Sequence, residues 1–176
     1  MGYINHLDRF VLLPGVAPAI ARLNRAGLVV VVTSNQSGVA RGYFSWDLVE
    51  AVTKRMKDLL ALDGARLDGI YYCLHHPQAE VPEYRKNCEC RKPRPGLIQK
   101  AAAELKLDPA RSFTIGDRVS DLIPGRAVGA RNILVLSGYG RGELEYVLPK
   151  ADVKPDYVAD DLARAVDWIL NEIEAE

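Results

Sequence analysis

The sequence lacks the features that mark membrane, secreted and nucleic-acid-binding proteins. No apolar run approaches the roughly 20 residues of a membrane span, and residues 1–10 contain no apolar core of a signal peptide. Neither sign of charge is in excess, because 23 Lys and Arg residues balance 23 Asp and Glu residues. A broad surface for nucleic acid or anionic lipid would need a basic excess. We therefore expect a cytoplasmic protein with neither nucleic-acid nor membrane partners.

Cysteine is also scarce, and its distribution is uneven. The 176 residues include three cysteines, an odd number, and all of them lie between positions 73 and 90. A reducing cytosol disfavours disulfides, so metal ligation is the leading explanation. Cys73-x-His75 and Cys88-x-Cys90 are two close pairs, and together they offer the Cys3His ligand set of a structural zinc site.

The cysteine loop, residues 73–90, leaves two points open. His76 could replace His75 as the fourth ligand, although the matching C-x-H and C-x-C spacing favours His75. The competing interpretation is three unrelated thiols and two surface histidines. If zinc is bound, four protein ligands leave no open position, so the ion should fold the loop and take no part in chemistry. Arg91 and Lys92 directly follow the last ligand, so the ion would position two cations.

Internal repeats, low-complexity stretches and linkers are absent as well, which predicts one domain over residues 1–176. Short β-branched runs alternate with helical patterns, which is typical of a Rossmann-like α/β fold with a parallel sheet and helices on both faces. The expected strands are residues 28–34, 67–73, 112–117, 132–137 and, at an edge, 156–160. The expected helices are residues 14–27, 45–64 with Ser45 as N-cap, 95–107, 120–128 and 161–175.

The first expected strand ends in polar residues that suit a binding site, because ligands of such sheets bind beyond the carboxyl ends of the strands. Thr33, Ser34, Asn35 and Gln36 offer hydroxyls and amides that could hold phosphate oxygens or sugar hydroxyls. A polar turn between a strand and a helix would use similar residues, so this stretch alone does not decide.

A pair of carboxylates follows the strand expected at 112–117. Asp117 ends the strand, and Asp121 comes one helical turn later. Such a pair suits a hard cation such as Mg2+, which takes oxygen ligands and bridges to phosphate. The alternative is that Asp117 is only the N-cap of the next helix.

In combination, these elements resemble the haloacid-dehalogenase-type phosphatases. A hydroxyl after one strand, a lysine after the cysteine loop and an aspartate pair after another strand are three of the four parts that this family uses. The segments VVTSNQSGVARG, GIYYCLHHPQ, CECRKPRPG and GDRVSD look like the D-glycero-D-manno-heptose 1,7-bisphosphate 7-phosphatases, in that order, and the match covers essentially the whole chain. The histidinol-phosphate phosphatases are close relatives with the same loop.

The resemblance implies catalytic roles for the matching residues. Ser34 would hydrogen-bond the transferring phosphoryl group, with Thr33 as the alternative if the register slips by one. Lys92 would neutralise charge on the nucleophile and the phosphate. Asp117 would bind the catalytic Mg2+, with Asp121 supporting it.

Substrate contacts and the zinc shell follow from the same resemblance. The substrate-binding residues would be Asn35, Gln36, Arg91 and Arg118. Arg118 stands where the family often has lysine, a departure that keeps the charge. The Zn2+ ligands would be Cys73, His75, Cys88 and Cys90. No insertion is large enough to form a cap, so the site should be open enough for a bisphosphorylated sugar.

The fourth part of the family pattern, an Asp-x-Asp pair that ends the first strand, is missing. Its first aspartate attacks phosphorus, and the second acts as general acid and base. Upstream of residues 28–34 the only aspartate is Asp8, which has no carboxylate two residues further on. Residues 2–16 instead resemble the segment that follows this strand, so roughly 20 residues of the pattern are absent from the front. Either the start at Met1 was assigned too far downstream, which we favour, or the product is truncated.

The missing strand matters for the fold, because in the family it is central. It lies between the strands that correspond to residues 28–34 and 112–117. Without it, each of these two strands is expected to have an edge with no partner.

The expected function is Mg2+-dependent hydrolysis of the 7-phosphate of D-glycero-D-manno-heptose 1,7-bisphosphate, in lipopolysaccharide or another nucleotide-heptose pathway. The chain as given is expected to be inactive unless it is extended. The alternatives are a histidinol-phosphate phosphatase and a non-catalytic zinc protein that binds phosphorylated sugars. We expect a monomer whose partner is a small phosphorylated sugar.

Overall fold

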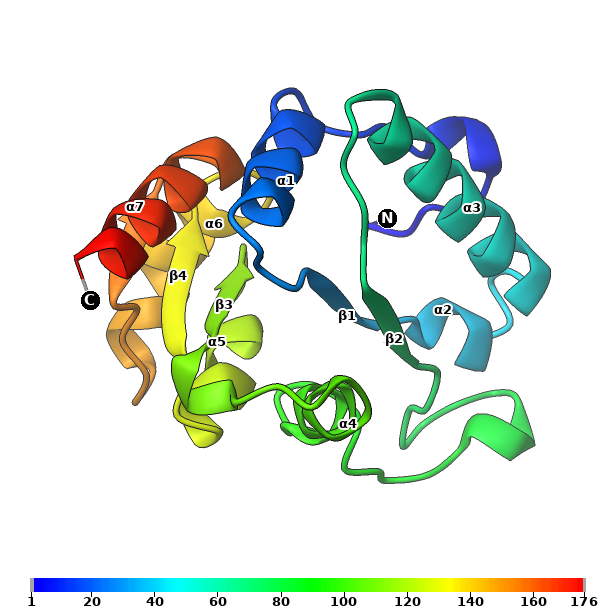
Figure 1. Ribbon diagram of the computed structural model, residues 1–176. Coiled ribbons are helices and arrows are strands. Elements are labelled where there is room, and N and C mark those ends of the chain that lie inside the picture. Colours follow the sequence, from blue (N-terminus) through cyan, green and yellow to red (C-terminus); the bar gives the residue numbers. More distant parts are fainter. Residues whose placement is uncertain (1, 176) are drawn as a thin grey trace. The chain divides into compact units, whose positions relative to one another are not determined.

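The computed structural model of the protein describes residues 2–175. Two compact units divide the chain, one up to Arg91 and the other from Lys92 onward (Figure 1). The expectation of a single domain over residues 1–176 stays a prediction.

The first unit contains a two-stranded parallel sheet. Its strands are β1 (Val31–Asn35) and β2 (Gly69–Cys73), and its helices are η1 (Leu7–Arg9), α1 (Val16–Arg25), α2 (Ser37–Ala40), α3 (Trp46–Leu62) and η2 (Pro82–Tyr84). Ser45 caps α3 as predicted, since its hydroxyl accepts a hydrogen bond from the Leu48 backbone N–H at 3.4 Å. Thr53 of α3 and Tyr72 of β2 share a hydroxyl–hydroxyl hydrogen bond of 2.7 Å, so α3 packs against this sheet.

The second unit contains a three-stranded parallel sheet in the order β3-β4-β5. Its strands are β3 (Phe113–Gly116), β4 (Arg131–Val135) and β5 (Tyr157–Ala159). Its helices are α4 (Gly96–Leu105), η3 (Pro109–Arg111), α5 (Val119–Ala127), α6 (Gly140–Gly142), the π-helix η4 (Glu143–Val147), η5 (Leu148–Lys150) and α7 (Leu162–Glu174). The prediction that residues 156–160 form an edge strand is confirmed by β5.

Helices cover both faces of the β3-β4-β5 sheet, as predicted. Successive residues of a strand point to opposite faces, and both Ile133 and Leu134 of β4 are fully buried. On one face, Leu134 packs in a cluster with Val119 and Leu122 of α5. On the other face, α7 packs against the strands through Trp168.

Trp168 holds α7 against the two outer strands of this sheet. Its ring stacks on Tyr157 of β5 with the centroids 5.0 Å apart, and Phe113 of β3 meets it edge-on at 5.8 Å. Arg131 of β4 lies over the Phe113 ring, with its guanidinium carbon 4.4 Å from the centroid. These contacts bridge all three strands, so the face under α7 is packed by aromatic side chains.

The strands form two parallel sheets, whereas the alternation of elements predicted one. Within residues 2–175, β1 pairs only with β2, and β3 pairs only with β4. One edge of β1 and one edge of β3 therefore have no partner strand among the described residues, as expected when the given sequence does not include the Asp-x-Asp strand. The residues of β1 are half-buried, because a strand with a single neighbour is covered less completely.

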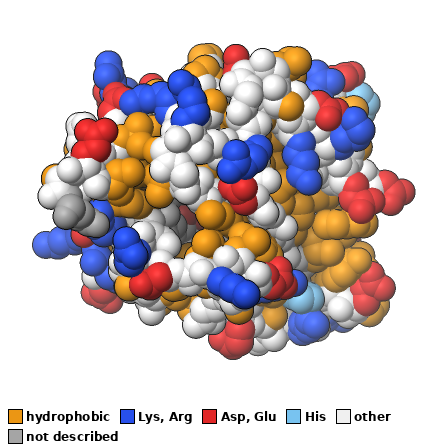
Figure 2. Space-filling view, in the orientation of Figure 1, with side chains coloured by type: hydrophobic (Ala, Val, Ile, Leu, Met, Phe, Trp, Pro, Cys, Tyr) orange, Lys and Arg blue, Asp and Glu red, His pale blue; other side chains and the backbone are white. Residues whose placement is uncertain are grey.

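Acidic and basic side chains lie interspersed on the face drawn in Figure 2. For the part of the chain that is described, no helix combines the length and apolar character needed to cross a membrane.

Candidate functional site

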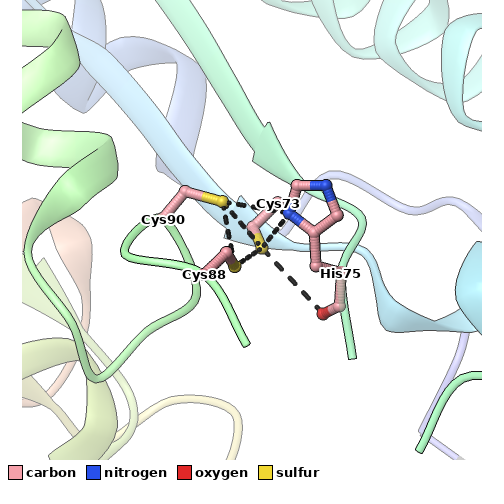
Figure 3. A group of neighbouring side chains, drawn as sticks. All are labelled: Cys73, His75, Cys88 and Cys90. Carbon is pink, nitrogen blue, oxygen red and sulfur yellow. Dashed lines mark hydrogen bonds between the residues drawn. The ribbon is translucent and has the colours of Figure 1, made fainter. Parts of the chain in front are cut away.

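The cysteine loop brings the four predicted metal ligands together. Cys73 ends β2, and the loop returns Cys88 and Cys90 to the same place, where all three thiols and the His75 ring point toward one another (Figure 3). The Sγ atoms are 3.2–3.5 Å apart, and Nδ1 of His75 is 3.3 Å from the Cys90 Sγ. The four ligand atoms all lie within 4.8 Å of one another, and we call them the Cys3His cluster.

The Cys3His cluster fits a tetrahedral metal ion. Zn–S bonds of about 2.3 Å place two thiolates of a tetrahedron about 3.8 Å apart, close to the separations found here. The cysteines form no disulfide, and Cys73 is fully buried. Soft sulfur ligands with one imidazole favour zinc over a hard cation. The loop therefore has the donors, and the spacing between them, that a zinc ion needs.

The structure decides between the two histidines, because only His75 belongs to the Cys3His cluster. The Nε2 atom of His76 lies 3.0 Å from the Arg41 Nη2 atom, and its Nδ1 accepts from the backbone N–H of Gln78 at 3.1 Å. Both ring nitrogens of His76 thus face atoms other than the thiols.

The protonation of the cluster is set by burial and by the thiols themselves. Burial raises the pKa of Cys73, and hydrogen bonding with Cys90 adds to the shift. Burial also raises the pKa of Cys90. At Cys88 burial opposes ionisation, but hydrogen bonds from Cys90 and Cys73 favour the thiolate, and the net pKa is lowered. Burial, with the nearby charge of Lys86, lowers the pKa of His75, which keeps the imidazole neutral, as a metal ligand must be.

The polar end of β1 lies beside this cluster. In the parallel register, Asn35 is opposite Cys73, and the Gln36 backbone N–H donates to the Cys73 carbonyl at 2.8 Å. The Gln36 side-chain amide donates to the Ser34 hydroxyl at 3.3 Å. Arg91, which follows the last cysteine, donates from Nη1 to the His75 carbonyl at 3.1 Å. The first unit thus gathers a hydroxyl, two amides and a guanidinium at the carboxyl ends of its strands.

The second unit contains the other predicted catalytic residues. Lys92 and Asp121 form an ion pair of 2.7 Å between Nζ and Oδ1, and each side chain is 15% exposed. Asp121 lies on α5 and packs directly against Gly116, where an added Cβ would overlap the Asp121 side chain. Because Asp117 is the next residue after Gly116, the lysine and both carboxylates meet at the carboxyl end of β3.

Asp117 is held by the segment at Gly138 and Tyr139, for which the sequence pattern predicts no helix or strand. Its Oδ2 atom accepts a hydrogen bond from the Tyr139 backbone N–H at 2.9 Å. Gly138 has a positive φ of 62°, and a Cβ at this position would collide with the Asp117 carboxylate. In return, the Glu143 carboxylate accepts from the Val119 backbone N–H at 2.9 Å, at the start of α5. The glycine-rich run SGYGRGE after an expected strand was the signal that could have located this segment.

Arg118 is oriented by the same segment. Its guanidinium carbon is 3.8 Å from the centroid of the Tyr139 ring, a cation–π contact. Tyr139 is half-exposed, so the pair lies at the surface beside Asp117. Asp8, by contrast, lies in the turn η1 with 82% of its side chain exposed and a contact to His6. This agrees with the expectation that Asp8 is not at the end of a buried strand.

We expect Gly116→Ala to disturb the Asp117 region. The new methyl group would meet the Cβ of Asp121, which the α5 backbone fixes, so strand or helix must shift. Overpacking of this kind costs about 1–3 kcal/mol, and urea unfolding would measure it. Gly142→Ala is the matched control, since no atom lies within 4 Å of its added Cβ. Equal unfolding free energies for the two variants would show that the contact between Gly116 and Asp121 is not tight.

Comparisons with known proteins agree on one group. Residues 89–165 match the HAD-hydrolase-like family model. The chain is 43% identical to a D-glycero-beta-D-manno-heptose-1,7-bisphosphate 7-phosphatase of Haemophilus influenzae, over 84% of this chain and 83% of that one. It is 42% identical to a D-glycero-D-manno-heptose-1,7-bisphosphate 7-phosphatase of Thermosynechococcus vestitus, over 98% and 90% of the two chains.

A similar solved structure is the D,D-heptose 1,7-bisphosphate phosphatase of B. bronchiseptica, complexed with magnesium and phosphate. It is 33% identical to this chain and has a TM-score of 0.85, over 97% of this chain and 89% of that one.

Proposed function

We propose that this protein acts in the hydrolysis of the 7-phosphate of D-glycero-D-manno-heptose 1,7-bisphosphate. The chain belongs to the haloacid-dehalogenase-like phosphatases and, among them, to the D-glycero-D-manno-heptose-1,7-bisphosphate 7-phosphatases. The observation that carries the proposal is the end of β3, where Lys92 is paired with Asp121 beside Asp117. A partly buried lysine paired with one carboxylate, with a second carboxylate at the carboxyl end of a parallel strand, suits an anionic group with a metal counter-ion.

In this proposal, each residue acts on one part of the phosphoryl group. Lys92 neutralises charge on the phosphoryl oxygens, and its ion pair with Asp121 fixes the direction of the ammonium group. Ser34 donates a hydrogen bond to the group during transfer. Asp117 is the direct ligand for Mg2+, which when bound offsets charge on the phosphate. Asp121 supports this ligand while it holds Lys92.

The attacking carboxylate is supplied by an Asp-x-Asp strand and by no residue of the given sequence. Its first aspartate forms the bond to phosphorus as the sugar oxygen leaves, and its second donates a proton to that oxygen. Water then attacks the aspartyl-phosphate. Zn2+ in the Cys3His cluster has a structural role, because four protein ligands leave it no position for substrate.

The heptose bisphosphate is favoured over histidinol phosphate as the substrate. The relatives and the structure reported above carry names of heptose bisphosphate phosphatases, at 33–43% identity. Asn35, Gln36, Arg91 and Arg118 are the proposed contacts to the sugar and its phosphates. We propose a cytoplasmic location, where thiol ligands stay reduced. A monomeric state and the absence of nucleic-acid and membrane partners stay predictions.

The experiment is a phosphate-release assay on a polypeptide that joins an Asp-x-Asp strand to residues 1–176. With Mg2+, we expect the heptose bisphosphate to be hydrolysed faster than histidinol phosphate. Asp117→Ala should lower kcat/KM by about 10^3-fold or more, because the metal ligand is lost. Asp152→Ala is the matched control, since Asp152 is an exposed carboxylate of the same unit.

Two results would contradict the proposal. One is full activity in excess EDTA while zinc is shown to be retained. The other is a kcat/KM for histidinol phosphate that exceeds the value for the heptose bisphosphate, which would make the runner-up the function.

A further inference from the structure

Arg41 is a half-buried cation that neither the fold nor the proposed catalytic residues account for. It directly follows α2, and the cysteine loop is tied to the end of this helix by a 3.0 Å hydrogen bond from the Val81 N–H to the Ala40 carbonyl. The Nε atom of Arg41 is inaccessible to solvent and has no hydrogen-bond partner within the described residues. A buried donor without an acceptor costs free energy, and more so when it is part of a charged group.

The contact between Arg41 and His76 does not satisfy either side chain. Nδ1 of His76 accepts from the Gln78 N–H, so in a neutral ring the hydrogen is on Nε2. Nε2 lies 3.0 Å from the Nη2 atom of Arg41, which is also a donor. Two donors therefore face each other, and an acceptor that takes a hydrogen from both would resolve the conflict.

Arg91, which directly follows the cysteine loop, is a third hydrogen-bond donor group besides Arg41 and His76. The Nη1 atom of Arg91 donates to the carbonyl of His75 at 3.1 Å, and His75 directly precedes His76, so this guanidinium lies beside the segment that carries the His76 ring. Across residues 2–175, the ion pairs found include neither Arg41 nor Arg91.

We propose that Arg41, His76 and Arg91 form a binding site for an oxyanion of the phosphate class, beside the Cys3His cluster. Guanidinium groups present planar forks of donors that match phosphate oxygens, and such an anion would accept from the two donors that face each other, Arg41 Nη2 and His76 Nε2. The choice of ligand rests on the proposed function. A bisphosphorylated sugar has a second phosphate, and this phosphate needs a binding site of its own. The Cys3His cluster then has a further role, because it fixes the loop that carries His76 and Arg91.

The first test uses the zinc-loaded chain and inorganic phosphate, followed by NMR at the His76 ring and the Arg41 Nε–H. We expect both signals to shift and saturate in wild type, and the affinity reported by His76 to fall about tenfold or more in Arg41→Gln. Arg55→Gln, which removes an exposed guanidinium from α3, is the matched control and should bind like wild type. Zinc content checks that each variant is folded.

The second test decides whether the site binds only a free phosphate ion or also the phosphate of a sugar. Arg41→Gln should weaken binding of heptose 1,7-bisphosphate and leave binding of heptose 7-phosphate unchanged, because only the former has a second phosphate. The site would be overturned if the NMR signals of His76 and Arg41 do not shift when phosphate is added. It would also be overturned if the affinity for phosphate is unchanged in Arg41→Gln. Phosphate that binds at His76 while the heptose bisphosphate does not bind would uphold the site and refute the proposed function.

Discussion

A polypeptide of residues 1–176 is expected to release no phosphate from heptose 1,7-bisphosphate. The same polypeptide preceded by a strand that ends in Asp-x-Asp is expected to hydrolyse this substrate. Loss of a covalent nucleophile typically costs on the order of 10^4- to 10^6-fold in rate. Phosphate release with Mg2+ and equal zinc content would measure the difference between the two polypeptides.

The physical reason is that the remaining groups can stabilise charge but cannot form the bond to phosphorus. Lys92 and Asp117 lie at the end of β3, and Ser34 lies on β1. Electrostatic stabilisation contributes several kcal/mol to a barrier, yet it needs an attacking atom. The added strand has edges to pair with, because one edge of β1 and one edge of β3 meet no strand of residues 2–175.

The control is the extended polypeptide in which the first aspartate of the pair is changed to asparagine, which should be inactive but folded. Robust turnover by residues 1–176 that is abolished by Asp8→Asn would show that the N-terminal segment was misinterpreted. Inactivity of both polypeptides with substrate still bound would favour the non-catalytic binding protein.

The purified chain is expected to contain about one zinc ion, and Cys90→Ser is expected to lose most of it. An ion present at 1,000 times its Kd stabilises the folded state by about 4 kcal/mol, so the variant should unfold at a clearly lower denaturant concentration. Metal analysis and urea unfolding would measure both effects. The loss of zinc should lower catalysis only because the loop that leads to Lys92 moves.

The two histidines provide a matched pair for this prediction. His75→Ala should lose zinc, because its Nδ1 belongs to the Cys3His cluster, whereas His76→Ala should retain it. Zinc uptake should also strengthen as the pH rises. Burial raises the pKa of Cys73 and Cys90, so without metal these thiols are protonated near neutral pH, and binding must displace their protons. A chain that contains no zinc, with all three thiols freely alkylated while folded, would contradict the prediction.

Local patterns predicted most of the elements, because their causes are local. Ser45 before an amphipathic run defines the start of α3, and the spacing of three cysteines and a histidine predicted the Cys3His cluster. The strand ends were predicted only to within a few residues. The first strand was expected from residue 28, whereas β1 begins at Val31, where its pairing with Gly69 begins. The segment from Gly138 to Val147 was missed, because its short α- and π-helical turns have no periodic apolar pattern.

Residue types, spacing and order were enough to predict the four residues of the Cys3His cluster and the phosphatase family. Those properties follow from chemistry that a short segment contains by itself. Only the tertiary structure decided that His75 rather than His76 faces the thiols, that Lys92 pairs with Asp121, and that Tyr139 binds Asp117 through its backbone. Each of these depends on how distant segments meet, because a loop's return path and a side chain's partner are set by packing across the fold.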